Sequence, residues 1–87
     1  MISAVNWSDK AQSDRENIFE SNYKNSGIKY ANSENGKFKK AIGTIKKNNQ
    51  IGRNDLHPIG YLYVLPKKYK ILYRLESNCI FIERIFY

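Results

Sequence analysis

The strongest constraint on the fold lies in residues 69–87. In residues 69–76, apolar and charged side chains alternate with a period of two, which is the pattern of a half-buried β-strand. Ser77 and Asn78 then supply turn chemistry, and residues 79–87 are rich in β-branched and aromatic side chains. The segment therefore predicts a β-hairpin that closes through a two-residue turn.

A two-residue turn also predicts which side chains share a face of the hairpin, because it pairs Glu76 with Cys79. One face is predicted to be a core surface interrupted only by Arg84. Its members are Tyr69, Ile71, Tyr73, Leu75, Ile80, Ile82 and Phe86. The opposite face consists of Lys70, Leu72, Arg74, Phe81, Glu83, Ile85 and Tyr87, a mixture that favours a binding or catalytic surface. A three-residue turn would exchange the faces of the second strand.

The rest of the chain predicts an α+β fold in a single domain, residues 1–87. The expected elements are a short strand at 1–7, a helix at 9–23, a polar connection at 25–36, a basic amphipathic helix around 37–47 and a strand at 61–65. With the C-terminal hairpin, the order is β-α-α-β-β-β. We expect a two-helix hairpin packed on one face of a small, mainly antiparallel four-stranded sheet. Periodicity does not fix where the first strand joins the sheet.

The charge is strongly basic and unevenly distributed along the 87 residues. The formal net charge is +7; residues 1–35 hold four Lys/Arg against five Asp/Glu, whereas residues 36–87 hold eleven against three. This asymmetry favours a polyanion or an acidic protein as partner of the C-terminal part. The single cysteine, Cys79, leaves no disulfide framework and no metal-ligand spacing. The sequence shows no membrane span and no signal peptide, so the expected location is cytoplasmic.

Two segments carry a resemblance to a known family. Residues 5–11 combine a hydrophobic strand, a Trp-Ser pair and a helix with an early Ala. Residues 69–75 read aromatic, cation, aliphatic, aliphatic, Tyr, variable, aliphatic. Together with the element order, length and basicity, these segments resemble the RelE/ParE superfamily of toxins from bacterial toxin-antitoxin modules, and the resemblance covers essentially the whole chain.

The resemblance implies a growth-inhibiting toxin, and its ribonuclease branch offers roles for particular residues. In that branch an Arg of the second segment contacts the scissile phosphate, and the matching residue here is Lys70. The branch often ends with a His or Tyr that transfers a proton or stacks on a base, which makes Tyr87 a candidate, while Phe86 stands where a His would be expected. Phe can stack on a base but cannot move a proton. The gyrase-poisoning branch shares the scaffold and needs no catalytic set.

The favoured expectation is a metal-free endoribonuclease that acts on mRNA, with or without the ribosome. Such cleavage needs cations at the phosphate and groups that move protons. The catalytic candidates are Lys70 and Arg74 as a phosphate clamp, Glu83 as a base, Tyr87 and Arg84. Lys67, Lys68, His57, Arg53, Lys40 and Lys47 are candidates for RNA binding. The plainer alternatives are that Lys70 and Arg74 form a solvated face with Glu83, and that Arg84 pairs with a carboxylate at the sheet edge.

Two other activities and several partners remain open. The chain can instead poison gyrase, or it can be a non-enzymatic basic protein that binds RNA or the ribosome. We expect no metal and no cofactor. The expected partners are RNA or the ribosome, with gyrase as the alternative, and an acidic antitoxin or immunity protein that folds over the basic face and the helix groove.

Overall fold

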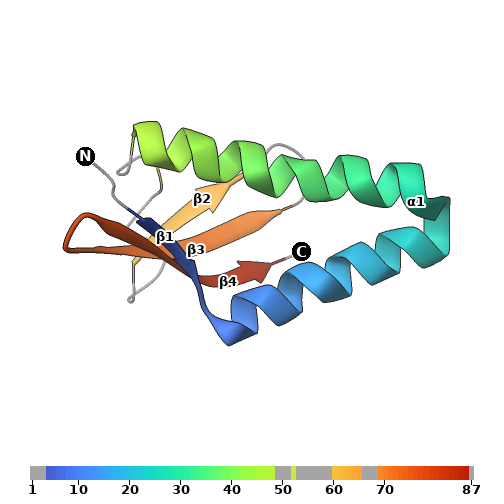
Figure 1. The fold of residues 1–87 in the computed structure, drawn as a ribbon, viewed down its shortest axis with the longest axis horizontal. Coiled ribbons are helices and arrows are strands. Elements are labelled where there is room, and N and C mark those ends of the chain that lie inside the picture. The colour runs from blue at the N-terminus through green and yellow to red at the C-terminus, as the bar shows by residue number, and fades with distance from the viewer. Residues whose placement is uncertain (1–3, 49–51, 53–59, 66–68, 87) are drawn as a thin grey trace.

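The computed structural model describes residues 4–48, 52, 60–65 and 69–86. Its elements are β1 (Ala4–Trp7), α1 (Asp9–Lys47), β2 (Tyr61–Val64), β3 (Lys70–Glu76) and β4 (Cys79–Phe86). The helix forms one layer and the sheet the other (Figure 1). Within the described residues, no helix is both long and apolar enough to cross a membrane.

The sheet has four strands in the order β1-β4-β3-β2. β1 runs parallel to β4, and the β4-β3 and β3-β2 pairs are antiparallel. The mainly antiparallel four-stranded sheet is therefore confirmed, and the first strand lies beside β4. The two-residue turn is also confirmed, since Glu76 pairs with Cys79, and both turn residues, Ser77 (φ 49°) and Asn78 (φ 63°), have the positive φ of a type I′ turn.

The structure has one helix where the sequence predicts two helices and a polar connection. α1 spans Asp9–Lys47 and leaves helical backbone angles only at Gly27, whose φ is 86° and ψ is 177°. The helix reverses direction there, so that its first arm (residues 9–26) and its second arm (residues 28–47) run in opposite directions and diverge from Gly27 toward the sheet (Figure 1). The predicted connection at 25–36 is therefore wrong, because all of it except Gly27 is helical.

The polar middle of α1 is helical because it continues a buried stripe. Ala31 and Glu34 are buried, and they precede Phe38, Ala41 and Ile45 at alternating spacings of three and four residues. That spacing keeps one side of a helix against the core. The first arm is capped by Ser8, whose hydroxyl accepts a hydrogen bond from the Ala11 N–H at 3.0 Å.

The core lies between α1 and one face of the sheet. Its members are Ala11, Ile18, Phe38, Ala41 and Ile45 from the helix, and Leu65, Tyr69, Ile71, Tyr73, Ile80, Ile82 and Ile85 from the sheet side. The rings of Phe38 and Tyr69 meet edge to face, with centroids 4.8 Å apart. We call the other side of β3 and β4, which alternation turns away from α1, the outer face of the hairpin.

A β-bulge changes the predicted faces at the end of β4. Leu72 pairs with Arg84 and Tyr73 pairs with Ile82, so Glu83 is an extra residue in β4. Beyond Glu83 the alternation is reversed, and Ile85 is 3% exposed in the core. The predictions that placed Arg84 on the core face and Ile85 opposite it are therefore wrong. Phe86, predicted on the core face, is only half-buried and lies beside Lys70. The bulge removes a charged side chain from the core surface.

Candidate functional site

The structure describes six of the predicted site residues. Lys70, Arg74, Glu83 and Arg84 lie on β3 and β4, and Lys40 and Lys47 lie exposed on the second arm of α1. The other five, Tyr87, Lys67, Lys68, His57 and Arg53, lie outside the described residues. The hairpin residues share the outer face, whereas α1 covers the opposite face of the sheet. The described candidates therefore form two separate groups and not one site.

Arg74 is held by carboxylates on the outer face. Its Nε donates to Glu83 Oε1 at 2.7 Å, and its Nη1 pairs with Glu76. The guanidinium also lies over the Phe81 ring, 4.5 Å from the centroid. Hydrogen bonds to Glu83 and then Glu76 raise the pKa of Arg74 above its ordinary value. A guanidinium with two carboxylate partners is poorly placed to clamp a phosphate.

Glu83 is engaged through both its side chain and its backbone. The carboxylate accepts from Arg74, and the carbonyl oxygen accepts from the Ser8 hydroxyl at 2.7 Å. The residue that precedes α1 therefore contacts the bulge at Glu83. Its contacts join the helix to the sheet and neutralise a neighbouring cation, so the carboxylate has less freedom to act as a base.

Arg84 forms a two-point ion pair with the first arm of α1. Its Nε donates to Asp14 Oδ2 at 2.7 Å, and its Nη2 donates to Asp14 Oδ1 at 3.0 Å. Asp14 Oδ2 also accepts from the Ile85 N–H at 3.0 Å. The hydrogen bond from Arg84 is the main reason that the pKa of Asp14 lies below its ordinary value. Asp14 was not among the predicted site residues, since a helix acid gives no sequence signal for a strand partner 70 residues away.

Lys70 is the exposed cation of the outer face. It pairs in register with Phe86 and lies on the same side of β3 as Arg74. Its ammonium is therefore the described group on the hairpin that most readily meets an anionic ligand. Within the described residues, no group of three or more His, Cys, Asp or Glu side chains is arranged to hold a metal ion.

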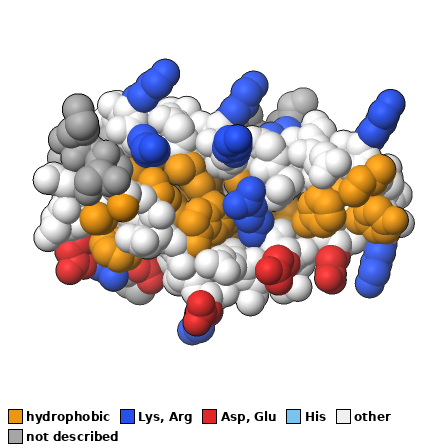
Figure 2. All heavy atoms as spheres, in the orientation of Figure 1, with side chains coloured by type: hydrophobic (Ala, Val, Ile, Leu, Met, Phe, Trp, Pro, Cys, Tyr) orange, Lys and Arg blue, Asp and Glu red, His pale blue; other side chains and the backbone are white. Residues whose placement is uncertain are grey.

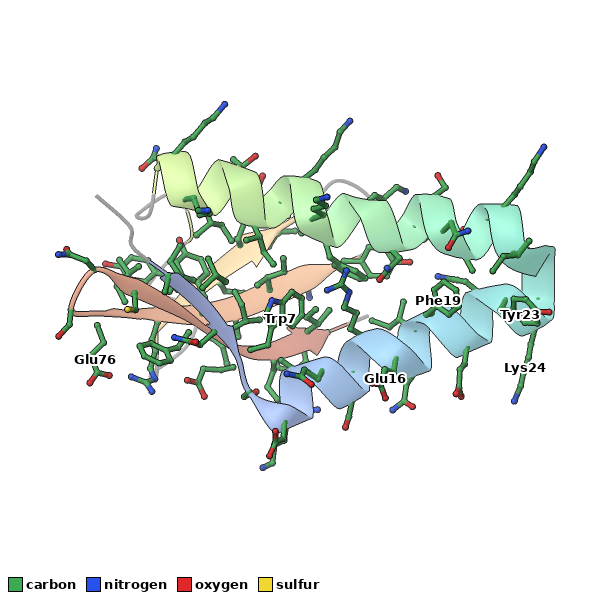
Figure 3. All side chains as sticks on the ribbon, viewed as in Figure 1. Trp7, Glu16, Phe19, Tyr23, Lys24 and Glu76 are labelled. Atoms are coloured by element: carbon green, nitrogen blue, oxygen red, sulfur yellow. The ribbon has the colours of Figure 1, made fainter. Side chains whose placement is uncertain are left out.

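The sequence predicted a helix groove as a docking place for an antitoxin, but it did not predict which residues line the groove between the arms of α1. Three adjoining hollows of about 260, 270 and 420 Å³ share lining residues along the first arm. We call this feature the interarm groove, and it is lined by Trp7, Gln12, Arg15, Glu16, Phe19, Glu20, Tyr23, Lys24 and Asn35. Figure 3 shows Trp7, Phe19 and Tyr23 along the space between the arms. The spacing of Arg15, Phe19 and Tyr23, four residues apart, is the signal that could have indicated a shared helix side.

Arg15 ties the walls of the interarm groove together. Its Nε donates to Asn35 Oδ1 on the second arm at 2.8 Å, and its guanidinium lies 4.9 Å from the centroid of the Trp7 ring in β1. One side chain thereby links both arms of α1 to the edge strand of the sheet.

A buried polar cluster lies where the arms meet the sheet. The Tyr69 hydroxyl donates to Glu34 Oε1 at 3.0 Å and accepts from Asn22 Nδ2 at 3.3 Å. The Tyr30 hydroxyl also donates to Glu34 Oε1, at 3.3 Å, and Lys37 Nζ lies 2.5 Å from Glu34 Oε2. Glu34 is 3% exposed, so these partners offset the cost of burying its carboxylate. The cluster fastens both arms to one tyrosine.

Comparison with known proteins identifies the fold. No protein-family model matches the chain, and no curated protein matches it. Among solved structures, the chain is similar to a chain from the chromosomal ParDE toxin-antitoxin system of P. aeruginosa, with a TM-score of 0.84 and 21% sequence identity. The similarity covers 99% of this chain and 95% of that chain. The fold that the resemblance to the RelE/ParE superfamily implied is therefore confirmed.

Proposed function

We propose that this chain is a growth-inhibiting toxin of the RelE/ParE type that acts in the cytoplasm. The observation that carries the proposal is the similarity over nearly the full length of both chains to a component of a toxin-antitoxin system. The formal net charge of +7 also suits a polyanionic target and an acidic antitoxin.

Inhibition by binding, as in gyrase poisoning, is the mode of action that the described geometry supports best. Both arginines of the predicted catalytic set are engaged by carboxylates, Arg74 by Glu83 and Glu76, and Arg84 by Asp14. Transition-state stabilisation at a phosphate needs cations that are free to meet the developing charge. These arginines instead stabilise the hairpin and its junction with α1, so they are less available as cations for RNA cleavage.

Metal-free RNA cleavage is the second candidate, and Lys70 favours it. The side chain is exposed on the outer face, at the position where the resemblance places a phosphate-binding Arg. Lysine keeps the charge but lacks the planar fork of a guanidinium, so it would hold a phosphate as a point charge. The other residues that this mechanism would use, Tyr87 above all, lie outside the described residues.

Three assays test the proposal in sequence. Induced expression should arrest growth in a bacterial host, and harmless expression would leave only a non-enzymatic RNA- or ribosome-binding protein. Purified protein is then incubated with gyrase and supercoiled plasmid, and separately with mRNA, free and on translating ribosomes. Trapped cleavage complexes or lost supercoiling activity would support the gyrase mode. RNA fragments that disappear in Lys70→Ala would support the ribonuclease and overturn our preference.

An acidic antitoxin is the partner that this function requires. Its binding segment would meet the basic side of the molecule, where the second arm of α1 contributes Lys40 and Lys47. The cheapest test is inspection of the neighbouring reading frames for a small acidic protein, followed by co-expression. Growth rescued by that protein supports the proposal. If no neighbouring frame rescues growth, an immunity protein encoded elsewhere becomes the alternative.

A further inference from the structure

The exposed side of the second arm carries positive charge and no acidic side chain. Residues 28–47 contain six lysines and one acidic residue, Glu34, which is buried. Lys37 pairs with Glu34, and the other five lysines are exposed and form no ion pair within the described residues. In Figure 2 the Asp and Glu atoms lie in the lower half of the view, whereas Lys and Arg side chains project from the upper edge, where Figure 1 places the second arm. A solvated helix commonly gains stability from Glu–Lys pairs four residues apart, and this exposed surface has none.

Three of these lysines share one line along the helix with small residues. We call this line the basic ridge, and it consists of Lys29, Ser33, Gly36, Lys40, Gly43 and Lys47. Its spacings alternate between four and three residues, and each member lies two positions from a member of the buried stripe, so the ridge is about half a helical turn away from the core. An added Cβ at Gly36 or Gly43 would meet nothing within 4 Å. The surface between the lysines is therefore open, and a partner can approach the helix backbone closely there.

The chemistry of the basic ridge selects among anionic partners. The ridge has no apolar side chain that a membrane or a protein segment could bury. It also has no aromatic side chain on which unpaired bases would stack. Ammonium and hydroxyl groups are instead the donors that phosphates of a double helix accept from. An α-helix about 10 to 12 Å across fits the major groove of DNA, about 12 Å wide, whereas the major groove of an RNA duplex is too narrow.

We propose that the basic ridge binds the phosphate backbone of a DNA duplex along the edge of the major groove. From Lys29 to Lys47 the ridge extends about 27 Å at 1.5 Å per residue, and one turn of DNA is about 34 Å long. The three lysines therefore reach phosphates within a single turn. Phosphate contacts carry no sequence information, so binding should be independent of sequence, with a dissociation constant on the order of 1 to 100 µM. This inference goes beyond the proposed function, because it adds DNA itself to the partners of the chain.

The test is fluorescence anisotropy of the full-length protein with a labelled DNA duplex of about 20 base pairs, at salt concentrations from about 50 to 200 mM. The wild type should bind, and the logarithm of its association constant should fall against the logarithm of salt concentration with a slope of about −3, because three lysines displace counterions. Lys40→Gln with Lys47→Gln should weaken binding by about tenfold or more and bring the slope to about −1. A duplex of unrelated sequence should bind equally well.

The matched control is Lys10→Gln with Lys24→Gln, which lowers the net charge equally on the exposed surface of the first arm. It should bind the duplex to within about twofold of the wild type, because only long-range attraction changes. Circular dichroism should show that all variants keep the same melting temperature. Equal weakening by the two pairs would show that net charge and not the ridge attracts DNA, and would overturn the proposal. So would absence of binding at the lowest salt concentration, or tighter binding of an RNA duplex or a single strand of the same sequence.

A polyglutamate peptide distinguishes an acidic protein segment from DNA as the occupant of the ridge. The peptide should bind more weakly than the duplex at the same salt concentration, because its charges are not arranged along a rigid double helix. A peptide that binds at least as tightly as DNA, and that loses its affinity with Lys40→Gln and Lys47→Gln, would assign the ridge to an acidic protein and overturn the proposal. DNA binding is measured with purified protein and without reference to toxicity, so its failure leaves the proposed function to its own assays.

Discussion

Asp14 and Arg84 join the first arm of α1 to the last strand through two hydrogen bonds, of 2.7 and 3.0 Å. Because Asp14 also accepts from the Ile85 N–H, its carboxylate covers the edge of β4 beyond the end of β1. This edge would otherwise expose unpaired backbone groups. One acidic side chain therefore neutralises an arginine and closes the sheet at the same point.

The Asp14 contact predicts acid sensitivity. The pKa of Asp14 is lowered from 3.8 in the folded protein, mainly by the hydrogen bond from Arg84. The unfolded chain therefore binds the proton more tightly, and the stability from Asp14 is fully present above pH 3.8 and lost as the pH falls through the folded pKa. Urea unfolding at neutral pH should show that Asp14→Asn lowers the free energy of unfolding by about 1 kcal/mol, with the difference shrinking in acid. Asp9→Asn, an exposed acid of the first turn, is the control, and an equal loss there would contradict this account.

The reversal of α1 predicts opposite effects for two glycines. Gly27 has φ 86°, where a side chain is strained, so Gly27→Ala should lower the free energy of unfolding by about 1 to 3 kcal/mol. Gly36 lies within the helical second arm, and an added Cβ there meets nothing within 4 Å. Gly36→Ala should therefore raise stability by about 0.5 to 1 kcal/mol through helix propensity. Chemical denaturation of both variants is the measurement, and a stabilising Gly27→Ala would show that the backbone at residue 27 is not fixed as described.

The sequence predicted the strands because their signals are local. Alternation in residues 69–76 and the positive-φ turn at Ser77 and Asn78 each act between neighbours in the chain. The bulge at Glu83 could not be predicted in this way. Its reversal of the faces depends on the core accepting Ile85 and on Asp14 accepting Arg84, and both conditions arise only when α1 packs on the sheet.

The same limit explains why the helical residues within 25–36 and the lining of the interarm groove were not predicted. Residues 25–36 are too polar for a helix on composition alone, yet Ala31 and Glu34 are buried because the first arm and Tyr69 surround them. The groove is formed by two arms that meet through a single-residue reversal at Gly27. When residues 25–36 are assigned to a connection, the start of the second arm, including Asn35, is not recognised as a wall of the groove.

The buried polar cluster predicts that the Tyr69 hydroxyl is important for stability. Tyr69→Phe would remove one donor to Glu34 and the acceptor for Asn22, in a site where Glu34 is 3% exposed. Weakening a buried hydrogen-bonded group in this way should lower the free energy of unfolding by about 1 to 3 kcal/mol. Tyr23→Phe is the matched control because its ring is 53% exposed, and it should change stability by about 0.5 kcal/mol or less. If Tyr69→Phe lowers the free energy of unfolding as little as Tyr23→Phe does, Tyr69 stabilises the protein through its ring and not through its hydroxyl.

Lys70 predicts different outcomes for the two modes of action. If the chain cleaves RNA, Lys70→Ala should slow cleavage by about two to three decades, which corresponds to roughly 2 to 4 kcal/mol of transition-state stabilisation. Because the side chain is exposed, the melting temperature should not change. In the binding mode that we favour, Lys70→Ala should still arrest growth. Lys40→Ala on α1 is the comparison, and growth arrest lost with Lys70→Ala alone would favour the ribonuclease.

Arg74 and Glu83 provide the sharpest separation of structure from catalysis. Removing Arg74 leaves Glu83 and Glu76 without their shared cation, so Arg74→Ala should lower the melting temperature of the protein. Arg74→Ala should also weaken growth inhibition, because less of the protein is folded. Adding Glu83→Gln removes one of the unpaired carboxylates, so the double variant should recover part of the melting temperature and part of the growth inhibition. A catalytic clamp and base would behave otherwise, since losing both groups cannot restore a reaction that needs each. Thermal melts and colony counts of the wild type, both single variants and the double variant complete the cycle. A double variant that recovers its melting temperature but does not inhibit growth would indicate that Arg74 and Glu83 are catalytic residues.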